Sequence, residues 1–504
     1  MESIRAGCRP QPRVLIYGDS NRDGKVDEAD IAGRDQWSWQ GPGAFFLANF
    51  DDDDQDGVAD CADRVINGSE DEADLAKLKV HLPPSLLEAG NDVRITASVA
   101  GVRLYQRDQD GWSLIEGPLK NPTAEMNLAI EGSALASKDW NGRVQLSLEV
   151  TDSQGQTLGS DRAQMRVAPL ILLPNTANTQ ELYVSTGHPN YENTRFREQL
   201  TSASQDAGVQ LVTHNTSSWK EMWMQDTMEV GYTQLPGGEP QHVVLGGLRQ
   251  ADSFGPSLLG PQRGFLQVGK YRGIQDGVDD WADWFGNLET TPPLPGYPLG
   301  RIFYGKNTDT GTTLHPELVS FLEAQEVQSP FWVDTGFLTI KHVDEIINFL
   351  PGADGQPRML MADTRSANQL APETDGPSNQ LNQQRLDKIL HGGSYPSGDS
   401  SPGLLTQLGL SEEQVVRLPV SYEGGHNVWS NPVNSIYLNG IAVTGDRHVP
   451  PAVAQEIEAQ LLAAGAQQVR FADDQRYQDN YGNVHCATNT LKQPVVQDFS
   501  RALT

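Results

Sequence analysis

The stretch Ala168-Pro-Leu-Ile-Leu-Leu-Pro-Asn175 divides the 504-residue chain into two parts of different character. It contains a continuous apolar run at residues 170–173 that a proline closes. After it, short strand patterns alternate with helical patterns up to the C-terminus. The clearest helical pattern places four apolar side chains on one face: Val453, Ile457, Leu461 and Ala464. The second part, residues 169–504, is therefore expected to be an α/β domain.

Within the first part of the chain, residues 76–168 are predicted to form a small antiparallel β-sandwich. Residues 93–99 and 143–150 alternate apolar and polar side chains with the two-residue period of a strand. Residues 102–105 and 111–115 form another such pair. Turn sequences separate these segments, and this spacing suits two packed sheets.

Two stretches are predicted to be long loops because of their composition. Residues 273–283 are rich in glycine and aspartate, and residues 366–404 are rich in glutamine, asparagine, glycine, serine and proline. Loops of this length are usually functional or mobile.

The charge balance excludes several classes of partner. Acidic residues outnumber basic residues by 66 to 37, a formal net charge of −29. General binding to nucleic acid or to anionic membranes needs basic patches and is not expected. No window approaches the ~18 consecutive apolar residues of a membrane span. The tail at residues 1–12 lacks the apolar segment of a secretory signal, so we expect a cytoplasmic location. The cysteines, which are Cys8, Cys61 and Cys486, are too few for a disulfide framework and are expected to be reduced.

The acidic residues concentrate between residues 19 and 74, where two segments have the spacing of an EF-hand-type calcium loop. Such a loop places oxygen ligands at positions 1, 3, 5, 9 and 12 around a glycine at position 6. The ligands would be Asp19, Asn21, Asp23, Asp27 and Asp30 in the first loop, and Asp52, Asp54, Asp56, Asp60 and Asp63 in the second. Two such loops within 45 residues favour calcium over a solvated acidic face. Flanking helices are not evident, so true EF-hand domains are not predicted.

Four segments of the second part carry residue types that perform chemistry. They are residues 223–232 (WMQDTMEVGY), 285–289 (FGNLE), 342–345 (HVDE) and 483–489 (NVHCATN). In an extended segment His342 and Asp344 would point to the same side. Cys486 has polar neighbours that suit a cleft, which makes it a candidate nucleophile; a small buried hydrophobe is the alternative. His485 would point away from Cys486 if that segment is extended.

In this order the four segments resemble the catalytic motifs of the peptidylarginine deiminase family, over roughly residues 13–504. The resemblance implies that residues 169–504 form an α/β propeller of five-fold pseudo-symmetry, of the type found in guanidine-modifying enzymes. It implies an immunoglobulin-like β-sandwich at residues 13–168, and a form that lacks the family's most N-terminal domain. The implied activity is the calcium-dependent hydrolysis of arginine side chains in proteins or peptides to citrulline and ammonia.

The resemblance also implies roles for individual residues. Cys486 would attack and form a thiouronium intermediate, His342 would be the general acid and base, and Asp226 and Asp344 would hold the guanidinium. Carboxylates suit that task because the guanidinium keeps its charge and presents a planar fork of donors. Two nearby aspartates should raise the pKa of the thiol, so either the cationic substrate or a charged His342 must help to form the thiolate.

Further substrate contacts follow from the same resemblance. Trp223 is expected beside the guanidinium pocket, with a core aromatic as the alternative, and Arg249 is expected near the substrate backbone. His426, which follows two glycines, is a weaker rival for the base.

A calcium site in the catalytic part is implied as well. Its ligands would be Gln225, Glu229, Phe285, Leu288 and Glu289, with Phe and Leu acting through their carbonyl groups. Gln225 and Glu229 flank Asp226, so metal binding could order the segment that delivers it. A second family site is expected to be absent or rebuilt, because Thr227, Gly246 and Gly247 replace oxygen ligands.

Two alternatives stay open. The family's second arginine near the substrate backbone is replaced by Ala251, which favours a deiminase of small guanidines such as free arginine or agmatine. A calcium-binding module with a decayed catalytic part is the other alternative, although the full set of catalytic residues argues against it. No oligomeric state is predicted.

Overall fold

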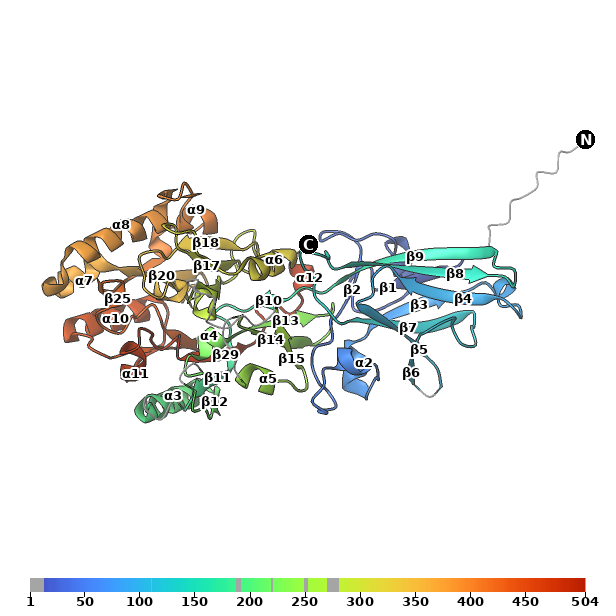
Figure 1. Cartoon of the computed structure of the whole chain (residues 1–504), viewed down its shortest axis with the longest axis horizontal. Coiled ribbons are helices and arrows are strands. Elements are labelled where there is room, and N and C mark those ends of the chain that lie inside the picture. The colour runs from blue at the N-terminus through green and yellow to red at the C-terminus, as the bar shows by residue number, and fades with distance from the viewer. Residues whose placement is uncertain are drawn as a thin grey trace, which may run out of the picture.

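The computed structural model describes residues 13–109, 111–186, 192–218, 221–248, 253–269 and 281–503. They form two lobes joined end to end (Figure 1). In these residues, ladder pairing keeps strands β1–β9 apart from strands β10–β29. The apolar run after Pro169 contains β10 (Ile171–Leu172), the first strand of the second group.

The first lobe is built from two mainly antiparallel sheets, of order β1-β3-β7-β5-β6 and β2-β9-β8-β4. Their strands are β1 (Leu15–Gly18), β2 (Ala44–Phe46), β3 (Ala76–His81), β4 (Asp92–Ala97), β5 (Val102–Arg107), β6 (Trp112–Leu114), β7 (Glu125–Gly132), β8 (Arg143–Thr151) and β9 (Thr157–Val167). The predicted strands are confirmed as β4, β5, β6 and β8. The immunoglobulin-like class of this lobe stays a prediction.

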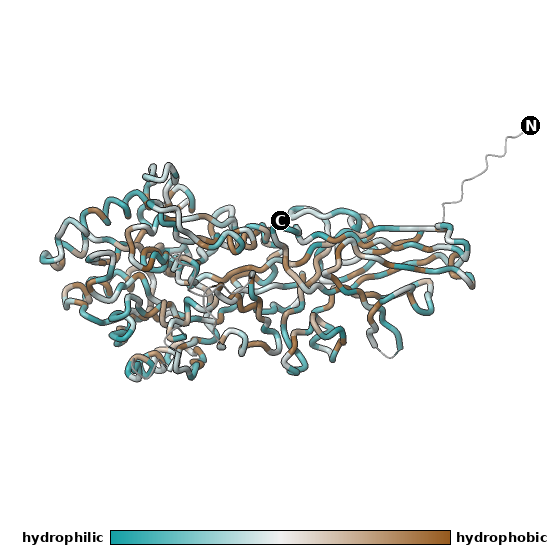
Figure 2. Tube along the Cα trace, viewed as in Figure 1, coloured by the Kyte–Doolittle hydropathy of each residue, from teal (hydrophilic) through white to brown (hydrophobic). Residues whose placement is uncertain are grey.

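The alternating pattern of these strands produces a shared core. On β8 the side chains of Val144, Leu146, Leu148 and Val150 are buried, and so are Val93 and Ile95 of the neighbouring β4. They belong to one cluster with apolar residues of β3 and β7 from the other sheet. Figure 2 shows the hydrophobic segments running along the strands inside this lobe, with hydrophilic segments at its turns.

Five small sheets make up the second lobe in the described part of the chain, together with two short hairpins. Their orders are β10-β13-β14-β15, β12-β11-β29, β16-β17-β18, β19-β20-β23 and β26-β27-β28. Each sheet combines antiparallel and parallel pairing. This repetition agrees in number with a five-fold arrangement, and a closed propeller stays a prediction.

The remaining elements have the following bounds. The strands are β11 (Thr179–Ser185), β12 (Gln210–His214), β13 (Met228–Gln234), β14 (Pro240–Gly246), β15 (Arg263–Gln267), β16 (Leu288–Thr290), β17 (Ile302–Lys306), β18 (Phe331–Asp334), β19 (Ile347–Pro351), β20 (Pro357–Asp363), β21 (Gly393–Ser394), β22 (Ser400–Ser401), β23 (Val415–Pro419), β24 (Tyr422–Glu423), β25 (His426–Asn427), β26 (Ile436–Leu438), β27 (Ile441–Gly445), β28 (Gln468–Ala472) and β29 (Thr488–Lys492). The α-helices are α1 (Asp60–Asp63), α2 (Ser69–Asp74), α3 (Thr194–Ala207), α4 (Met224–Thr227), α5 (Phe254–Ser257), α6 (Pro316–Ala324), α7 (Thr364–Leu370), α8 (Pro377–His391), α9 (Leu404–Leu408), α10 (Pro451–Ala464), α11 (Gln475–Gln478) and α12 (Phe499–Ala502). The 3-10 helices are η1 (Glu28–Ala32), η2 (Pro84–Leu86), η3 (Trp281–Asp283), η4 (Phe285–Asn287), η5 (Val343–Glu345), η6 (Pro372–Thr374) and η7 (Glu412–Gln414).

The helix predicted at the C-terminal side is confirmed as α10, and the four apolar residues of its pattern are its buried residues. The prediction of a loop at residues 366–404 is wrong, because this stretch contains α8. Pro377 occupies its first turn, and its buried face includes amide side chains. Gln383 Oε1, for example, accepts a hydrogen bond of 2.7 Å from the backbone N–H of Thr364. The buried amides Asn379, Asn382 and Gln383 interrupt the spacing of apolar residues that marks a helix. The sequence pattern therefore does not indicate α8. Most of the loop predicted at residues 273–283 lies outside the described residues.

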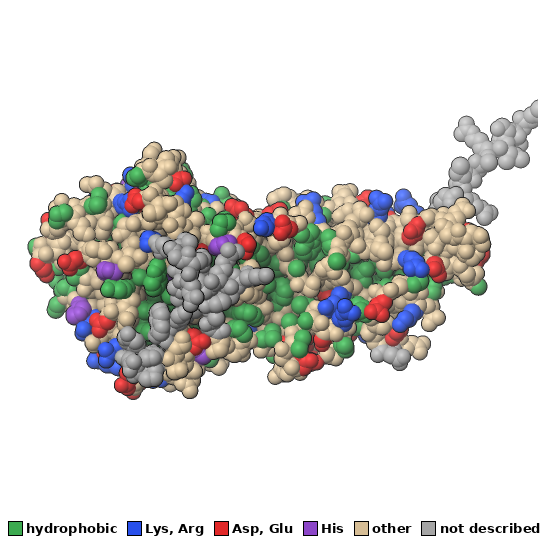
Figure 3. All heavy atoms as spheres, viewed as in Figure 1, with side chains coloured by type: hydrophobic (Ala, Val, Ile, Leu, Met, Phe, Trp, Pro, Cys, Tyr) green, Lys and Arg blue, Asp and Glu red, His purple; other side chains and the backbone are tan. Residues whose placement is uncertain are grey.

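Buried polar groups connect the two lobes. Gln241 of β14 donates to Oδ1 of Asn49, at 2.7 Å, and to Oδ1 of Asp51, at 2.5 Å. Gln325 donates to the carbonyl of Ala136 at 2.8 Å. The acidic segment of the first lobe is therefore tied directly to a strand of the second. On the face shown in Figure 3, basic side chains lie scattered among acidic and uncharged ones. None of the helices in the described ranges has the length and apolar character to cross a bilayer.

Candidate active site

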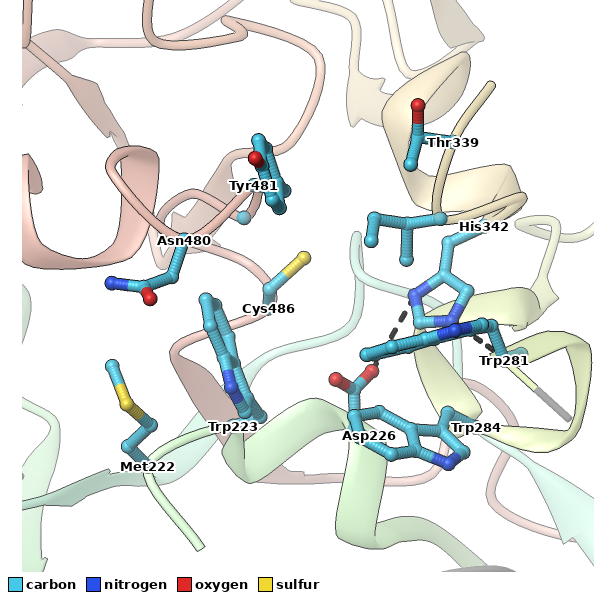
Figure 4. A pocket seen from close by; sticks show the side chains of 12 residues that line it. Met222, Trp223, Asp226, Trp281, Trp284, Thr339, His342, Asn480, Tyr481 and Cys486 are labelled. Atoms are coloured by element: carbon cyan, nitrogen blue, oxygen red, sulfur yellow. Dashed lines mark hydrogen bonds and ion pairs between the residues drawn. The ribbon is translucent and has the colours of Figure 1, made fainter. Parts of the chain in front are cut away.

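One pocket of the second lobe is lined by three of the four predicted catalytic residues: Asp226, His342 and Cys486. It has a volume of ≈ 270 Å³. Its walls are formed by Met222, Trp223, Asp226, Trp281, Trp284, Thr339, Ile340, His342, Asn480, Tyr481, Gly482 and Cys486. Figure 4 shows the sulfur of Cys486 and the carboxylate of Asp226 facing the same space, with Trp223 beside the cysteine and His342 opposite it. The aromatic walls suit a flat cation, because aromatic faces attract guanidinium groups.

Three separate segments deliver these groups. Asp226 lies on α4, immediately before β13. His342 precedes η5, which contains Asp344. Cys486 lies in the turn that leads into β29, and its carbonyl accepts a hydrogen bond of 3.3 Å from the backbone N–H of Gln225. That bond joins the cysteine turn to the helix that carries Asp226.

The sulfur of Cys486 has two polar neighbours among the described side chains. Its Sγ donates to Oδ2 of Asp344 at 3.3 Å, and Nδ2 of Asn434 donates to Sγ at 3.1 Å. Burial raises the pKa of the Cys486 thiol well above its usual range, and the charges of Asp344 and Asp226 add to this effect. The cysteine is therefore a protonated thiol in this state. Asn434 was missed by the sequence analysis, because it lies in none of the four segments.

His342 is held by a backbone group and a carboxylate. Its Nε2 lies 2.8 Å from the carbonyl oxygen of Trp281, which can only accept, so Nε2 carries a proton. Its Nδ1 lies 3.5 Å from Oδ1 of Asp226. Burial lowers the pKa of His342, and the charge of Asp344 opposes this shift. The expected extended pairing of His342 with Asp344 is wrong: residues 343–345 form a 3-10 helix, and Asp226 is the nearer carboxylate.

Asp226 is buried and lies against a glycine. Its Oδ1 accepts a hydrogen bond of 3.1 Å from the backbone N–H of Gly286. A Cβ atom at Gly286 would collide with Nδ1 of His342, so only glycine permits this close approach. Burial raises the pKa of Asp226 well above its usual range, and the charge of Asp344 contributes. Asp226 and Asp344 are thus two buried carboxylates close to Cys486.

His485 bridges two acidic groups. Its Nδ1 lies 2.9 Å from Oδ2 of Asp344, and its Nε2 lies 3.4 Å from Oε1 of Glu289. The expectation that His485 points away from Cys486 is wrong, because residues 484–487 form a turn and both side chains reach Asp344. The imidazole therefore lies between the proposed guanidinium site and a proposed calcium ligand. The rival base, His426, stacks on Tyr481 with ring centroids 3.9 Å apart.

The residues expected to bind calcium in this lobe are partly brought together. Nε2 of Gln225 donates to Oε2 of Glu229 at 2.9 Å and to the carbonyl of Phe285 at 3.3 Å. Leu288 and Glu289 begin β16 directly after η4. Burial raises the pKa of Glu229 to about 8. Burial, together with the charges of Glu229 and Asp344, raises the pKa of Glu289 well above its usual range.

This donor set fits a hard cation. Oε1 of Glu289 is buried and accepts no hydrogen bond from the described residues, although Nε2 of His485 lies 3.4 Å from it. Buried carboxylates with free oxygen atoms are the ligands that calcium prefers. The charge of Lys492 acts on both glutamates, and burial lowers the pKa of Lys492 itself to about 7. Arg249, expected near the substrate, lies outside the described residues.

The two acidic loops of the first lobe fold as similar turns. In the first, the carboxylate of Asp19 accepts from the N–H groups of Asp23, at 3.0 Å, and Gly24, at 2.9 Å. In the second, Asp52 accepts from Asp56 and Gly57 at the same two distances. Gly24 and Gly57 have φ of 86° and 88°, which explains the glycine at this position.

The two loops differ at their later positions. Asp27 caps η1 by accepting a hydrogen bond of 2.8 Å from the N–H of Ala29, and Asp30 reaches back to the N–H of Asn21 at 3.1 Å. In the second loop the acidic side chains converge. One oxygen each from Asp52, Asp54 and Asp60, and likewise from Asp54, Asp56 and Asp63, lie within 4.8 Å of one another. The second loop thus offers carboxylates to a metal, whereas part of the first is used for helix capping.

A further acidic cluster was missed by the sequence analysis. Asp51, Asp53 and Asp74 bring one oxygen each within 4.8 Å of one another. Burial and the neighbouring aspartates raise the pKa of Asp51 to about 9 and that of Asp74 to about 7. Oδ2 of Asp74 and both oxygens of Asp53 have no hydrogen-bond partner among the described residues. The only sequence feature that points to this cluster is the run of four aspartates at residues 51–54. Asp51 and Asp53 join this cluster, whereas Asp52 and Asp54 belong to the second loop.

Known proteins resemble this chain along most of its length. A family model described as "Protein-arginine deiminase (PAD)" matches residues 157–392. Protein-arginine deiminase type-4 of Homo sapiens is 28% identical over 95% of this chain and 81% of its own length. Protein-arginine deiminase type-1 of Mus musculus is 26% identical over the same shares. Among solved structures, an agmatine deiminase of C. jejuni matches 64% of this chain and 96% of its own at 11% identity, with a TM-score of 0.40.

Proposed function

The chain belongs to the protein-arginine deiminase family, and from this premise we propose that it hydrolyses arginine side chains of proteins or peptides to citrulline and ammonia. The observation that carries the proposal is the convergence of a thiol, an imidazole and two carboxylates around one pocket. The proposal includes a covalent intermediate on Cys486 and dependence on calcium.

Substrate binding would resolve the excess of negative charge in the pocket. A guanidinium keeps its charge and offers planar N–H donors to two carboxylates. Between Asp226 and Asp344 it would lower the raised pKa of Asp226, because a nearby opposite charge favours the ionised form. The same charge would favour the thiolate of Cys486. The substrate would thus help to create the nucleophile that attacks it.

The reaction can be written with its bonds balanced. The thiol of Cys486 first gives its proton to Nδ1 of His342, and the resulting thiolate attacks the guanidinium carbon, so a C–S bond forms and the π electrons move onto nitrogen. The departing nitrogen takes a proton from His342, the C–N bond breaks and ammonia leaves a thiouronium intermediate. Water then gives a proton to His342 and adds to the same carbon. The C–S bond breaks, and citrulline leaves with the thiolate restored.

His342 is placed for this proton transfer. Its Nε2–H is bound to the carbonyl of Trp281, so Nδ1, on the side of Asp226, is the atom that exchanges a proton with the substrate. Its lowered pKa makes the protonated imidazole a ready donor to the departing nitrogen, and the neutral imidazole that remains can accept a proton from water. Trp223 and Trp284 would shield the reacting groups from bulk water.

Calcium would be held in the second lobe by Gln225, Glu229 and Glu289, with the carbonyl groups of Phe285 and Leu288. In the first lobe it would be held by the acidic clusters described above. When bound, it supplies positive charge to buried carboxylates and holds together the segments that carry them. Gln225 and Glu229 flank Asp226 in sequence, so ordering them would also order the clamp for the guanidinium.

A comparison of substrates tests the proposed function. We expect a blocked arginine amide or an arginine peptide to give a higher kcat/KM than free arginine or agmatine, in millimolar calcium. A preference for free arginine or agmatine would replace the proposal with a small-guanidine deiminase. The absence of any turnover, with calcium still bound, would leave a calcium-binding module.

A further inference from the structure

We propose that Asn434 is a positioning residue for the nucleophile: its side-chain amide fixes the sulfur of Cys486 for attack and for departure. This inference rests on the proposed function. Asn434 precedes β26 and is 1% exposed. Its Nδ2 donates to Sγ of Cys486 at 3.1 Å, and its Oδ1 accepts from the backbone N–H of the same cysteine at 3.2 Å. One amide thus holds both the backbone and the side chain of Cys486.

The two polar contacts of the sulfur have opposite character. Asp344 accepts the thiol proton through Oδ2, so this hydrogen bond exists only while the sulfur is protonated. Once the proton leaves, the carboxylate and the thiolate repel each other. The amide N–H of Asn434 donates to the sulfur in either state. Among the described side chains with a hydrogen bond to this sulfur, it is the one donor that remains available to the thiolate.

The backbone around Asn434 is held independently of the cysteine. Nδ2 of Asn348 donates to the carbonyl groups of Val433, at 2.9 Å, and Ser435, at 2.7 Å, on either side of Asn434. Nδ2 of Asn431 donates to the carbonyl of Glu345 at 2.8 Å, which ties the same segment to the end of η5. These hydrogen bonds fix the backbone on both sides of Asn434. The fixed backbone in turn directs the side-chain amide of Asn434 toward the sulfur.

A donor to sulfur helps both chemical steps. In the first it orients the thiolate lone pair toward the guanidinium carbon, and in the second it stabilises the thiolate that departs from the thiouronium. Neither effect requires contact with the ground-state substrate. Loss of the amide should therefore lower kcat while KM changes little.

Alkylation of Cys486 by iodoacetamide tests this role without relying on deiminase activity. The modified cysteine is quantified by peptide mass spectrometry, with buried Cys61 as the internal reference. We expect Asn434→Ala to alkylate about tenfold more slowly than the native chain, the size of effect of one hydrogen bond to a charged group. On a blocked arginine amide, kcat should fall by a similar factor with KM within about twofold.

Two further variants separate the N–H donor from general loosening. Asn434→Asp keeps an acceptor for the N–H of Cys486 but loses the donor to sulfur. Its Cys486 should therefore be alkylated as slowly as in Asn434→Ala. This variant replaces Asn434→Ala if the latter does not fold. Asn348→Ala releases the same segment without touching the sulfur, so it should unfold at a lower temperature yet alkylate within about twofold of native.

Any of three results overturns the inference. The first is a native rate of Cys486 alkylation in both Asn434 variants, and the second is an equally slow alkylation in Asn348→Ala. The third is a rise in KM of the Asn434 variants in place of the fall in kcat. Failure of the proposed function looks different. Cys486 of the native chain would then alkylate at the expected rate, and no citrulline would form from any arginine substrate.

Discussion

The sulfur of Cys486 lies 3.3 Å from Oδ2 of Asp344, so the proposed nucleophile donates its proton to a group proposed to bind the substrate. The same oxygen accepts from His485, whose other nitrogen faces Glu289. In this state the thiol is protonated and its pKa is raised. Arrival of a guanidinium would take Asp344 away from the sulfur and supply the missing positive charge. On this account Cys486 becomes a nucleophile only when a cation enters the pocket.

Replacing Asp344 by asparagine should have opposite effects on binding and on the thiol. We expect kcat/KM for a blocked arginine amide to fall about 100-fold or more, because loss of one partner of a buried charge pair costs about 3 kcal/mol or more. Without substrate, alkylation of Cys486 near neutral pH should become faster, because a negative charge that raises the pKa of the thiol is gone.

The exposed Asp354 provides a matched control, since Asp354→Asn changes the net charge equally and lies on the surface beside Arg358. It should leave both rates unchanged. Slower alkylation in Asp344→Asn would contradict the account of the resting thiol.

Glu229→Gln should weaken calcium binding in the second lobe. The buried carboxylate is one of the proposed ligands, and its amide replacement carries no charge. We expect the calcium concentration for half-maximal activity to rise at least about tenfold, with kcat at saturating calcium within a few-fold of native. Calorimetric titration should show the loss of one class of site.

Glu239 is exposed in the turn after β13, which makes Glu239→Gln the control on the same hairpin. Native calcium affinity in Glu229→Gln would remove Glu229 from the proposed ligands.

The acidic cluster of the first lobe should make stability depend on pH when calcium is absent. Burial raises the pKa of Asp51 to about 9, whereas an unfolded aspartate titrates near 4. The folded state therefore holds a proton that the unfolded state has released. The stabilisation is fully present below about pH 4 and is lost as the pH rises through about 9.

Asp51→Asn removes this titration. In chelator the native chain should lose stability as the pH rises from about 6 to 9, whereas the variant should not lose this contribution. The unfolding temperature of the variant should therefore rise relative to that of the native chain over this range. Millimolar calcium should reverse the difference, because the native carboxylate then binds the metal. Thermal unfolding followed by fluorescence measures both. A difference that falls with pH in chelator would show that Asp51 is not held protonated in the fold.

The sequence predicted those parts of the molecule in which local pattern and structure coincide. The two-residue period of β8 and the apolar face of α10 both follow from side chains that meet one core. The pocket residues Asp226, His342, Asp344 and Cys486 were found through their motifs, and the structure brings them together. Their partners were not predictable in the same way. His342 lies beside Asp226 because residues 343–345 form a 3-10 helix. Whether this short segment is extended or helical depends on tertiary packing.

Polar residues that act at a distance escaped the sequence analysis for a related reason. Asn434 lies 52 positions from the cysteine that it contacts, and no local spacing connects them. The helix α8 buries three amide side chains, Asn379, Asn382 and Gln383, so apolar residues occupy only the second half of its buried face. In the acidic segment, Asp51 and Asp53 alternate with Asp52 and Asp54, and only the path of the backbone decides which pair meets Asp74.

The most direct test of the central claim is citrulline formation from a blocked arginine amide at neutral pH. The native chain would be assayed with millimolar calcium and with chelator, and Cys486→Ala would be assayed in parallel with calcium. The account predicts citrulline and ammonia in equal amounts from the native chain with calcium, and none in chelator or from the variant. Equal citrulline formation by Cys486→Ala would contradict the proposed nucleophile, and full activity in chelator would contradict the dependence on calcium.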